Sequence, residues 1–144
     1  MENNIIDSIK GNILNEYIFS NNTINTVQSL TNQGTLTGNT VNVIEYLKNE
    51  GGSSIIADNI FDTVIKIENK GEIKNNQIGF INYLYNELIF QNNIIDSINN
   101  YIKNTGTIEN NTSITIEDFD NLSNGIVKNN TIKDILKLNN SGTI

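Results

Sequence analysis

Residues 34–50 read GTLTGNTVNVIEYLKNE, and this stretch holds in order every feature that recurs along the chain. A Gly opens the unit, four apolar residues stand at its positions 3, 8, 11 and 14, and Asn occupies positions 6 and 16. The apolar residues, mostly β-branched or Leu, are broken by Asn and Gly, as in short strands between turns. A unit of about 17 residues is too short for a helix, two turns and a strand, which argues against ankyrin-like and helical-pair repeats.

The unit repeats along the chain. Residues 3–9, NNIIDSI, recur without change at residues 92–98, an offset of 89. Asn-x-Gly triplets end at Gly34, Gly71, Gly106 and Gly142, which are 37, 35 and 36 positions apart. A period of about 17 or 18 residues accounts for both spacings. It divides the chain into one solenoid domain, residues 1–144, with units starting near Asn3, Tyr17, Gly34, Ser54, Gly71, Leu88, Gly106 and Gly125.

Alignment on this period produces columns of like residues. The four apolar positions of the first stretch carry Ile, Leu, Val or Phe in the other units, and Ser113 is a polar exception. One Asn column is unbroken: Asn4, Asn22, Asn39, Asn59, Asn76, Asn93, Asn111 and Asn130. A second column closes the unit at Asn15, Asn32, Asn49, Asn69, Asn86, Asn104 and Asn140. The alignment needs insertions at positions 51–53 and near Asp120 and Asn121.

These columns predict an all-β fold, a parallel β-solenoid of about eight coils, each of roughly 17–20 residues. We expect a right-handed or a two-layered coil, because the apolar spacing does not match the even six-residue repeat of left-handed hexapeptide helices. Stacked parallel strands lie about 4.8 Å apart, so eight coils form a rod about 40 Å long. We expect the Asn columns to form side-chain amide ladders between coils and to supply left-handed backbone at the corners. We expect the Gly after the second Asn column to supply another positive-φ corner.

The composition excludes several kinds of site. The chain has no Cys, His, Pro or Trp, while Asn and Ile together fill about two fifths of it, far above ordinary usage. Disulfides, Cys/His zinc sites, thiol nucleophiles and Ser-His-Asp triads are therefore absent. A net charge of −7 with nine scattered basic residues gives no footprint for nucleic acid. No apolar run reaches the roughly 18 residues of a membrane span. We expect no cofactor and no metal.

Outward charges vary in sign along the predicted coils. One column runs Glu50, Lys70, Glu87, and another runs Lys74, Gln91, Glu109, Lys128. Like charges directly above one another destabilise a sheet, so this order favours a solvated face with cross-coil pairs.

The phrases at residues 30–36, LTNQGTL, and 102–108, IKNTGTI, resemble the repeats of filamentous-haemagglutinin-like and autotransporter-like surface adhesins. The resemblance implies a right-handed β-helix and an exported adhesive or fibre role. This chain departs from those families in its shorter coils, in its Asn content, and in its first residues, MENN, which lack the basic and apolar segments of a secretory signal. We expect an extracellular or cell-surface location.

The terminal units suggest self-stacking. The repeat begins by Asn3 and breaks off inside a further unit at residues 140–144, without the atypical polar coils that usually cap a solenoid. Met1 and Ile144 fall on the same position of the unit, so residue 2 of a second copy can continue the first copy. Head-to-tail contacts of this kind do not close and grow filaments. The other interpretations are a fragment of a longer solenoid and a capped rod.

Three kinds of function stay open. The first is a non-catalytic structural subunit of a surface or extracellular filament, with itself as partner. The alternative is a fragment of a secreted adhesin that binds cell-surface glycans or proteins. In a related ligand-binding rod, Tyr46, Tyr83 and Tyr101 could stack on sugars, but we expect them on non-adjacent coils, as ordinary outward residues of strands. The third is a polysaccharide-active enzyme, which needs clustered acids. Its candidate acids, which we expect to be ordinary turn residues, are Asp58, Asp62, Glu117, Asp118 and Asp120, the last three also conceivable calcium ligands.

Overall fold

The computed structural model describes residues 1–144 and contains fifteen strands, in which long and short strands alternate along the chain. The long strands are β1 (Ile5–Asn15), β3 (Thr23–Asn32), β5 (Thr40–Asn49), β7 (Ile60–Asn69), β9 (Gln77–Asn86), β11 (Ile94–Asn104), β13 (Thr112–Asn121) and β15 (Thr131–Asn140). The short strands are β2 (Ile18–Ser20), β4 (Thr35–Thr37), β6 (Ile55–Ala57), β8 (Glu72–Lys74), β10 (Ile89–Gln91), β12 (Thr107–Glu109) and β14 (Ile126–Lys128).

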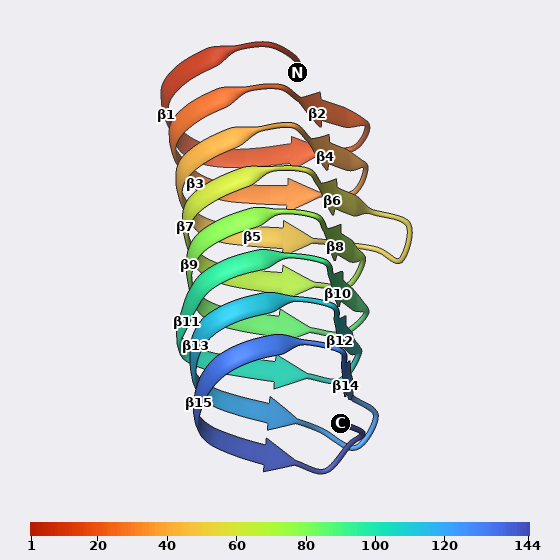
Figure 1. Cartoon of the computed structure of the whole chain (residues 1–144). Helices are drawn as coiled ribbons and strands as arrows, with labels where there is room; N and C mark the ends of the chain where they lie inside the picture. The colour runs from red at the N-terminus through yellow and green to blue at the C-terminus, as the bar shows by residue number, and fades with distance from the viewer.

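Each strand pairs in parallel with the strand two places along the chain. The long strands form an eight-stranded sheet in the order β1-β3-β5-β7-β9-β11-β13-β15, and the short strands form a seven-stranded sheet. The long strands curve round one side and the short strands close the other, so that successive coils stack into a rod with the two termini at opposite ends (Figure 1). The protein is a parallel β-solenoid of about eight coils, as the repeat predicts.

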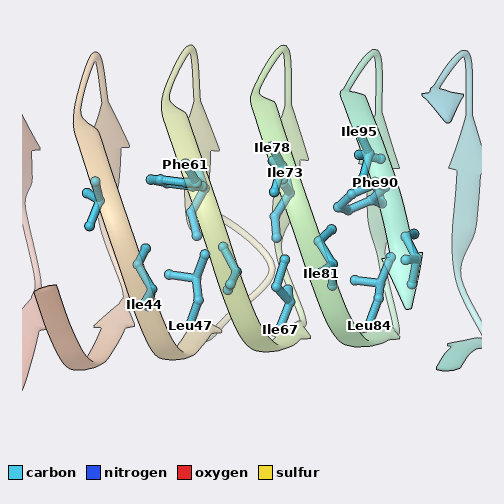
Figure 2. Close-up of a cluster of buried hydrophobic side chains, with 14 of the residues drawn as sticks. Ile44, Leu47, Phe61, Ile67, Ile73, Ile78, Ile81, Leu84, Phe90 and Ile95 are labelled. Carbon is cyan, nitrogen blue, oxygen red and sulfur yellow. The ribbon is translucent and has the colours of Figure 1, made fainter. Parts of the chain in front are cut away.

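The four apolar columns line the inside of the coil. In the long strands of the middle coils the inward residues stand at the second, fifth and eighth positions, as in β5 and β7. Because side chains alternate on a flat strand, an inward spacing of three requires the strand to bend, and this bending wraps it round the core. Figure 2 shows Leu47, Ile67 and Leu84, which the strand register places above one another in three successive coils. One cluster of 24 buried hydrophobic residues runs along the axis.

The coil length varies by insertions and bulges that leave the core in register. Successive residues of the first Asn column are 18, 17, 20, 17, 17, 18 and 19 positions apart. The longest interval contains the loop at residues 51–53, as predicted. The two intervals of 18 contain bulges, between Ile9 and Asn12 in β1 and between Ile98 and Tyr101 in β11. Both bulges follow directly after the repeated heptapeptide.

The second insertion lies later than the sequence alignment placed it. Asn121 pairs with Asn104 on one side and with Asn140 on the other, so it belongs to the second Asn column. The extra residues are in the turn at 122–124, which is closed by the Gly125 N–H donating to the Leu122 carbonyl at 2.7 Å. The alignment missed Asn121 because the inserted turn follows it directly and contains another Asn.

The prediction of which residues form the left-handed corners is wrong. Positive φ occurs at the residue before each Asn of the first column and not at that Asn itself. The residues concerned are Asn3, Asn21, Gly38, Asp58, Asn75, Asn92, Asn110 and Asn129. Asn, Asp and Gly tolerate this conformation best, which explains why the sequence so often doubles the Asn there. The ladder Asn itself is the first residue after the corner.

The recurrent Gly also has a different role from the one predicted. Gly34, Gly71, Gly106 and Gly142 do not have positive φ. A Cβ at Gly106 would meet the Leu88 carbonyl oxygen and lie 2.6 Å from the Leu88 backbone nitrogen in the preceding coil. Gly is therefore required for the close approach of two backbones rather than for a special dihedral angle.

Candidate functional site

The first Asn column forms a buried ladder of amides along the rod. Asn76 is typical: its Nδ2 donates to Asn93 Oδ1 at 3.0 Å, to the Lys74 carbonyl at 2.8 Å and to the Ile56 carbonyl at 3.1 Å. Its Oδ1 accepts from both the backbone N–H and the Nδ2 of Asn59, each at 3.0 Å. Every amide hydrogen and the amide oxygen are thus used inside the protein. The predicted ladder is present in full.

The second Asn column forms a parallel ladder at the next corner. Each Nδ2 donates to the Oδ1 of the next coil at 2.7–3.0 Å, from Asn15 through to Asn140. Asn32 also donates to the carbonyl of Gly34 in its own coil and to that of Ile55 in the next. The two ladders flank the short strands and tie the corners of neighbouring coils together.

Both ladders have the same polarity, which makes the two ends of the rod different. In each ladder, Nδ2 of one coil donates to Oδ1 of the coil that follows it. The donors of the last coil therefore have no following acceptor, and the Oδ1 atoms of the first coil have no preceding donor. At the C-terminal end, the Asn130 backbone N–H makes no hydrogen bond, whereas the same group of Asn111 donates to Asn130 Oδ1 at 2.9 Å. At the N-terminal end, Asn4 Oδ1 and Asn15 Oδ1 accept no hydrogen bond. The open donors and open acceptors are complementary.

The two end faces are also apolar. At the C-terminal end the exposed fractions of Ile135, Leu138 and Ile144 are 36%, 46% and 63%, although the same columns are fully buried in the middle coils. These residues and Phe119 line a hollow of about 320 Å³. At the N-terminal end, Met1 is 55% exposed, and Ile6, Ile9 and Ile13 are only partly covered. Each face therefore leaves a row of core residues without a covering coil.

The outward charges form the expected cross-coil contacts. Lys128 pairs with Glu109 at 2.8 Å and Lys70 with Glu87 at 3.6 Å, in the two columns where the sequence showed changes of sign. Three further ion pairs join residues two positions apart on or beside one strand, such as Lys48 and Glu50 at 2.7 Å. These side chains are partly exposed, by 20–56%, and each pair contributes little.

Four of the five tyrosines gather on the outer face of the second half of the long strands. Tyr83 and Tyr101 are direct partners in β9 and β11, which corrects the expectation that the outward tyrosines lie on non-adjacent coils. Tyr85, which the sequence analysis did not single out, meets Tyr101 edge to face at 6.2 Å between ring centroids. Lys66 lies over the rings of Tyr46 and Tyr85 at 5.2 and 5.4 Å. The alternation of outward residues in 83–85 was the available signal for Tyr85.

Two of these tyrosines are held by carboxylates of the next coil. The Tyr46 hydroxyl donates to Glu68 at 2.6 Å, and the Tyr101 hydroxyl donates to Asp120 at 2.7 Å. Burial, and then these hydrogen bonds, raise the pKa of both tyrosines to about 12. Hydrogen bonds from Lys66 and Tyr46 lower the pKa of Glu68, and those from Asn139 and Tyr101 lower the pKa of Asp120.

The candidate acids do not converge on a site. Asp58 is a positive-φ corner residue, and Asp62 lies on the outer face of β7. Asp118 is paired with Lys137 at 2.8 Å, and Asp120 accepts from Tyr101 and Asn139. Glu117 lies on the outer face of β13. No three acidic side chains gather as they would to hold a metal ion.

The fold has no helix that is long and apolar enough for a membrane crossing. Comparison of the chain with protein-family models, with curated proteins and with solved structures finds no match.

Proposed function

We propose that this protein is a non-catalytic structural subunit whose copies stack end to end, the C-terminal face of one on the N-terminal face of the next. The observation that carries the proposal is the complementarity of the ladder ends. In a stack, Asn4 Oδ1 of the next copy receives the backbone N–H and Nδ2 of Asn130, as Asn130 Oδ1 receives those of Asn111 at 2.9 and 3.0 Å. Asn15 Oδ1 in the same way receives Nδ2 of Asn140.

The strands continue in the same register. β1 of the next copy pairs in parallel with β15, and its Ile6, Ile9 and Ile13 extend the columns that end in Ile132, Ile135 and Leu138. Edge strands otherwise present unpaired backbone groups and exposed apolar residues to water. Because the contact joins two different faces, each addition leaves a new free face, and the product is a filament rather than a closed ring.

One residue at the junction is surplus. Met1 and Ile144 both belong to the inward column of the short strands, at the same level of the stack, so one of them leaves that position. The Met1 carbonyl accepts the Ser20 N–H at 2.9 Å and its amino group donates to the Ile18 carbonyl at 3.0 Å. Ile144 makes no backbone hydrogen bond. We therefore expect Ile144, and not Met1, to move out of the shared position when two copies stack.

The test is assembly of the full chain, measured by negative-stain microscopy and sedimentation over a range of concentrations. Filaments one solenoid wide, with lengths that grow with concentration, are expected. The variant Ile135→Lys leaves the lysine free to reach water in the monomer but buries its charge in a stack, so it should remain a folded rod and fail to assemble. The matched control is Ile60→Lys, on the outer face of a middle coil where Ile60 is 52% exposed, which should assemble normally. Monomeric rods about 40 Å long at every concentration would overturn the proposal.

A second candidate function is adhesion, as the resemblance to surface adhesins implies, and the tyrosine face favours it. The exposed ring of Tyr83 and the half-buried rings beside it, with Lys66, Glu68 and the unpaired Lys103, are suited to stacking on sugar rings and hydrogen-bonding their hydroxyls. Binding of the chain to immobilised cell-surface glycans, lost in Tyr83→Ala with the fold intact, would support this role and an extracellular location. Equal binding by wild type and variant would exclude this face as the binding surface.

A further inference from the structure

We infer that two ion pairs between stacked copies, Asp7 with Lys133 and Glu2 with Lys128, select the head-to-tail orientation of the contact. The inference rests on the proposed end-to-end stacking and explains why a C-terminal face binds an N-terminal face rather than another C-terminal face. It comes from the outward columns, in which the first coil contributes a carboxylate and the last coil contributes an ammonium group.

The first pair lies on the outer face of the long strands. The register places Asp7, Asn25 and Asn42 above one another, and adjacent members are hydrogen-bonded, Asn25 Nδ2 to Asp7 Oδ1 at 3.3 Å and Asn42 Nδ2 to Asn25 Oδ1 at 3.1 Å. Side chains one coil apart in this column are therefore within reach of each other. The complete column is Asp7, Asn25, Asn42, Asp62, Gly79, Asp96, Ile114 and Lys133.

Lys133 is the last residue of that column and its only cation. It takes part in none of the ion pairs of the protein, and its neighbour in the preceding coil is the apolar Ile114. Stacking brings Asp7 of the next copy directly over it. In a stack, Lys133 of one copy therefore faces Asp7 of the next. In the single chain, Lys133 has no ion-pair partner.

The second pair lies on the outer face of the short strands. Glu2 bridges to Ser20 at the start of this column, and Lys128 is its last residue. Lys128 and Glu109 already form an ion pair across one coil step at 2.8 Å. Since Glu2 of the next copy occupies the coil position after Lys128, the same step places it on the other side of the ammonium group.

The remaining outward positions of the junction put no like charges together. The register pairs neutral residues with charged or neutral ones: Ile5 with Thr131, Ser8 with Asp134, Lys10 and Gly11 of the bulge with Leu136, Asn12 with Lys137, Leu14 with Asn139 and Glu16 with Ser141. The first coil carries three carboxylates and one lysine, and the last coil carries three lysines and one carboxylate, so a contact between two like faces brings together mainly like charges. Like-charge contacts of this kind disfavour wrong partners. The charges therefore select the head-to-tail contact.

The test uses two single reversals in the full chain, Asp7→Lys and Lys133→Asp. Each variant alone presents like charges at every junction, so the concentration needed for assembly should rise roughly two- to thirtyfold at low salt. An equimolar mixture of the two variants has opposite charges at every junction between unlike copies, and it should assemble at the wild-type concentration as an alternating filament. Salt near 1 M, where the Debye length is about 3 Å, should remove most of the difference between the samples in the concentration needed for assembly.

The control is Asp62→Lys, which makes the same change in the same column away from both ends. It should assemble like the wild type. If the wild type forms no filaments, the stacking proposal itself fails. If the wild type and both single variants assemble at the same concentration, and mixing the variants does not lower it, the stacking stands and the inferred role of the ion pairs is wrong.

Discussion

The asparagine side chain suits the ladder positions because it carries both partners that a stack needs. Its NH₂ group donates forward to the next coil and sideways to backbone carbonyls, while its oxygen accepts from the coil before. Asp would lack the donors and bring a buried charge, and Ser would reach only one partner. The six middle Asn residues of the first ladder are almost completely buried, from Asn22 to Asn111. A buried amide at this position stabilises the fold only when all of its hydrogen bonds are made.

Substitution Asn76→Ala should therefore be strongly destabilising. It removes the acceptor for the N–H and Nδ2 of Asn59 and the donor for Asn93 Oδ1 and two backbone carbonyls, and all of these bonds except the one to the Lys74 carbonyl are buried. We expect the free energy of unfolding in urea to fall by about 2–4 kcal/mol. Asn42→Ala, on the exposed outer column, should change it by less than about 0.5 kcal/mol. Equal effects of the two substitutions would contradict a structural role for the ladder.

At the scale of the strand, the constraint is close contact between successive backbones. The corner after the second ladder brings the chain so near the preceding coil that a side chain has no room at Gly106. Gly52, in the loop after β5, has open space around its Cα and no positive φ. The two glycines therefore differ in what a methyl group would meet.

Gly106→Ala should push two coils apart and lower the free energy of unfolding by at least about 2 kcal/mol, because backbone atoms and not a flexible side chain stand in the way. Gly52→Ala should be neutral or stabilising by up to about 1 kcal/mol, through the entropy of the unfolded chain. Thermal unfolding of both variants against the wild type checks this. A stable Gly106→Ala protein would show that the corner can relax.

The pairs that join Tyr46 to Glu68 and Tyr101 to Asp120 link neighbouring long strands and depend on pH at both extremes. Because the pKa of each carboxyl is lowered, its contribution is present above the unfolded pKa of about 4 and is lost as the pH falls below it. Because the pKa of each tyrosine is raised to about 12, its contribution is complete below pH 10 and is lost between pH 10 and 12.

Stability measured by urea unfolding should accordingly fall between pH 10 and 12, and the fall should be smaller in Tyr46→Phe, which has no proton to lose. Tyrosinate absorbance gives an independent reading, since the variant should lack part of the absorbance that develops near pH 12. An unchanged alkaline slope in the variant would show that the Tyr46 contact does not contribute to stability.

At the scale of the whole molecule, the rod is close to a one-dimensional system. Each coil contacts only its neighbours, so stability is approximately a sum of coil terms and interface terms. The middle coils have two interfaces and the terminal coils have one, which is why residues equivalent to the buried core are exposed in β15. A further coil at either end supplies the missing interface without altering the rest of the rod.

Removal of Ile144 should favour assembly, because it clears the position that Met1 of the next copy occupies. The expected result is a lower critical concentration by sedimentation, with an unchanged circular dichroism spectrum of the monomer. Removal of residues 141–144 is the contrasting variant, since it also takes away the backbone hydrogen bonds of Thr143 with Gly125 and Val127 and should weaken the C-terminal face. A higher critical concentration after removal of Ile144 alone would contradict the geometry of the junction.

The repeat, the parallel coils, the four apolar columns and the first Asn ladder all follow from the order of the amino acids. These are properties of spacing: once coils stack, residues at the same phase of the period must lie above one another, so position in the repeat fixes position in space. Asn4 to Asn130 could be named as a ladder for that reason alone. The alternation of charge in two outward columns followed from the same rule.

Features that depend on dihedral angles, on hydrogen-bond direction or on local changes of register become visible only in the folded chain. Two neighbouring Asn residues look alike in sequence, yet Asn75 turns the corner and Asn76 makes the ladder, because only the backbone shows which has positive φ. The inserted turn at 122–124 concealed Asn121, and the adjacency of Tyr83 and Tyr101 appeared only with the strand pairing. The polarity of the ladders, which leaves donors at one end and acceptors at the other, is set by the rotamer of each amide and has no signal in the sequence.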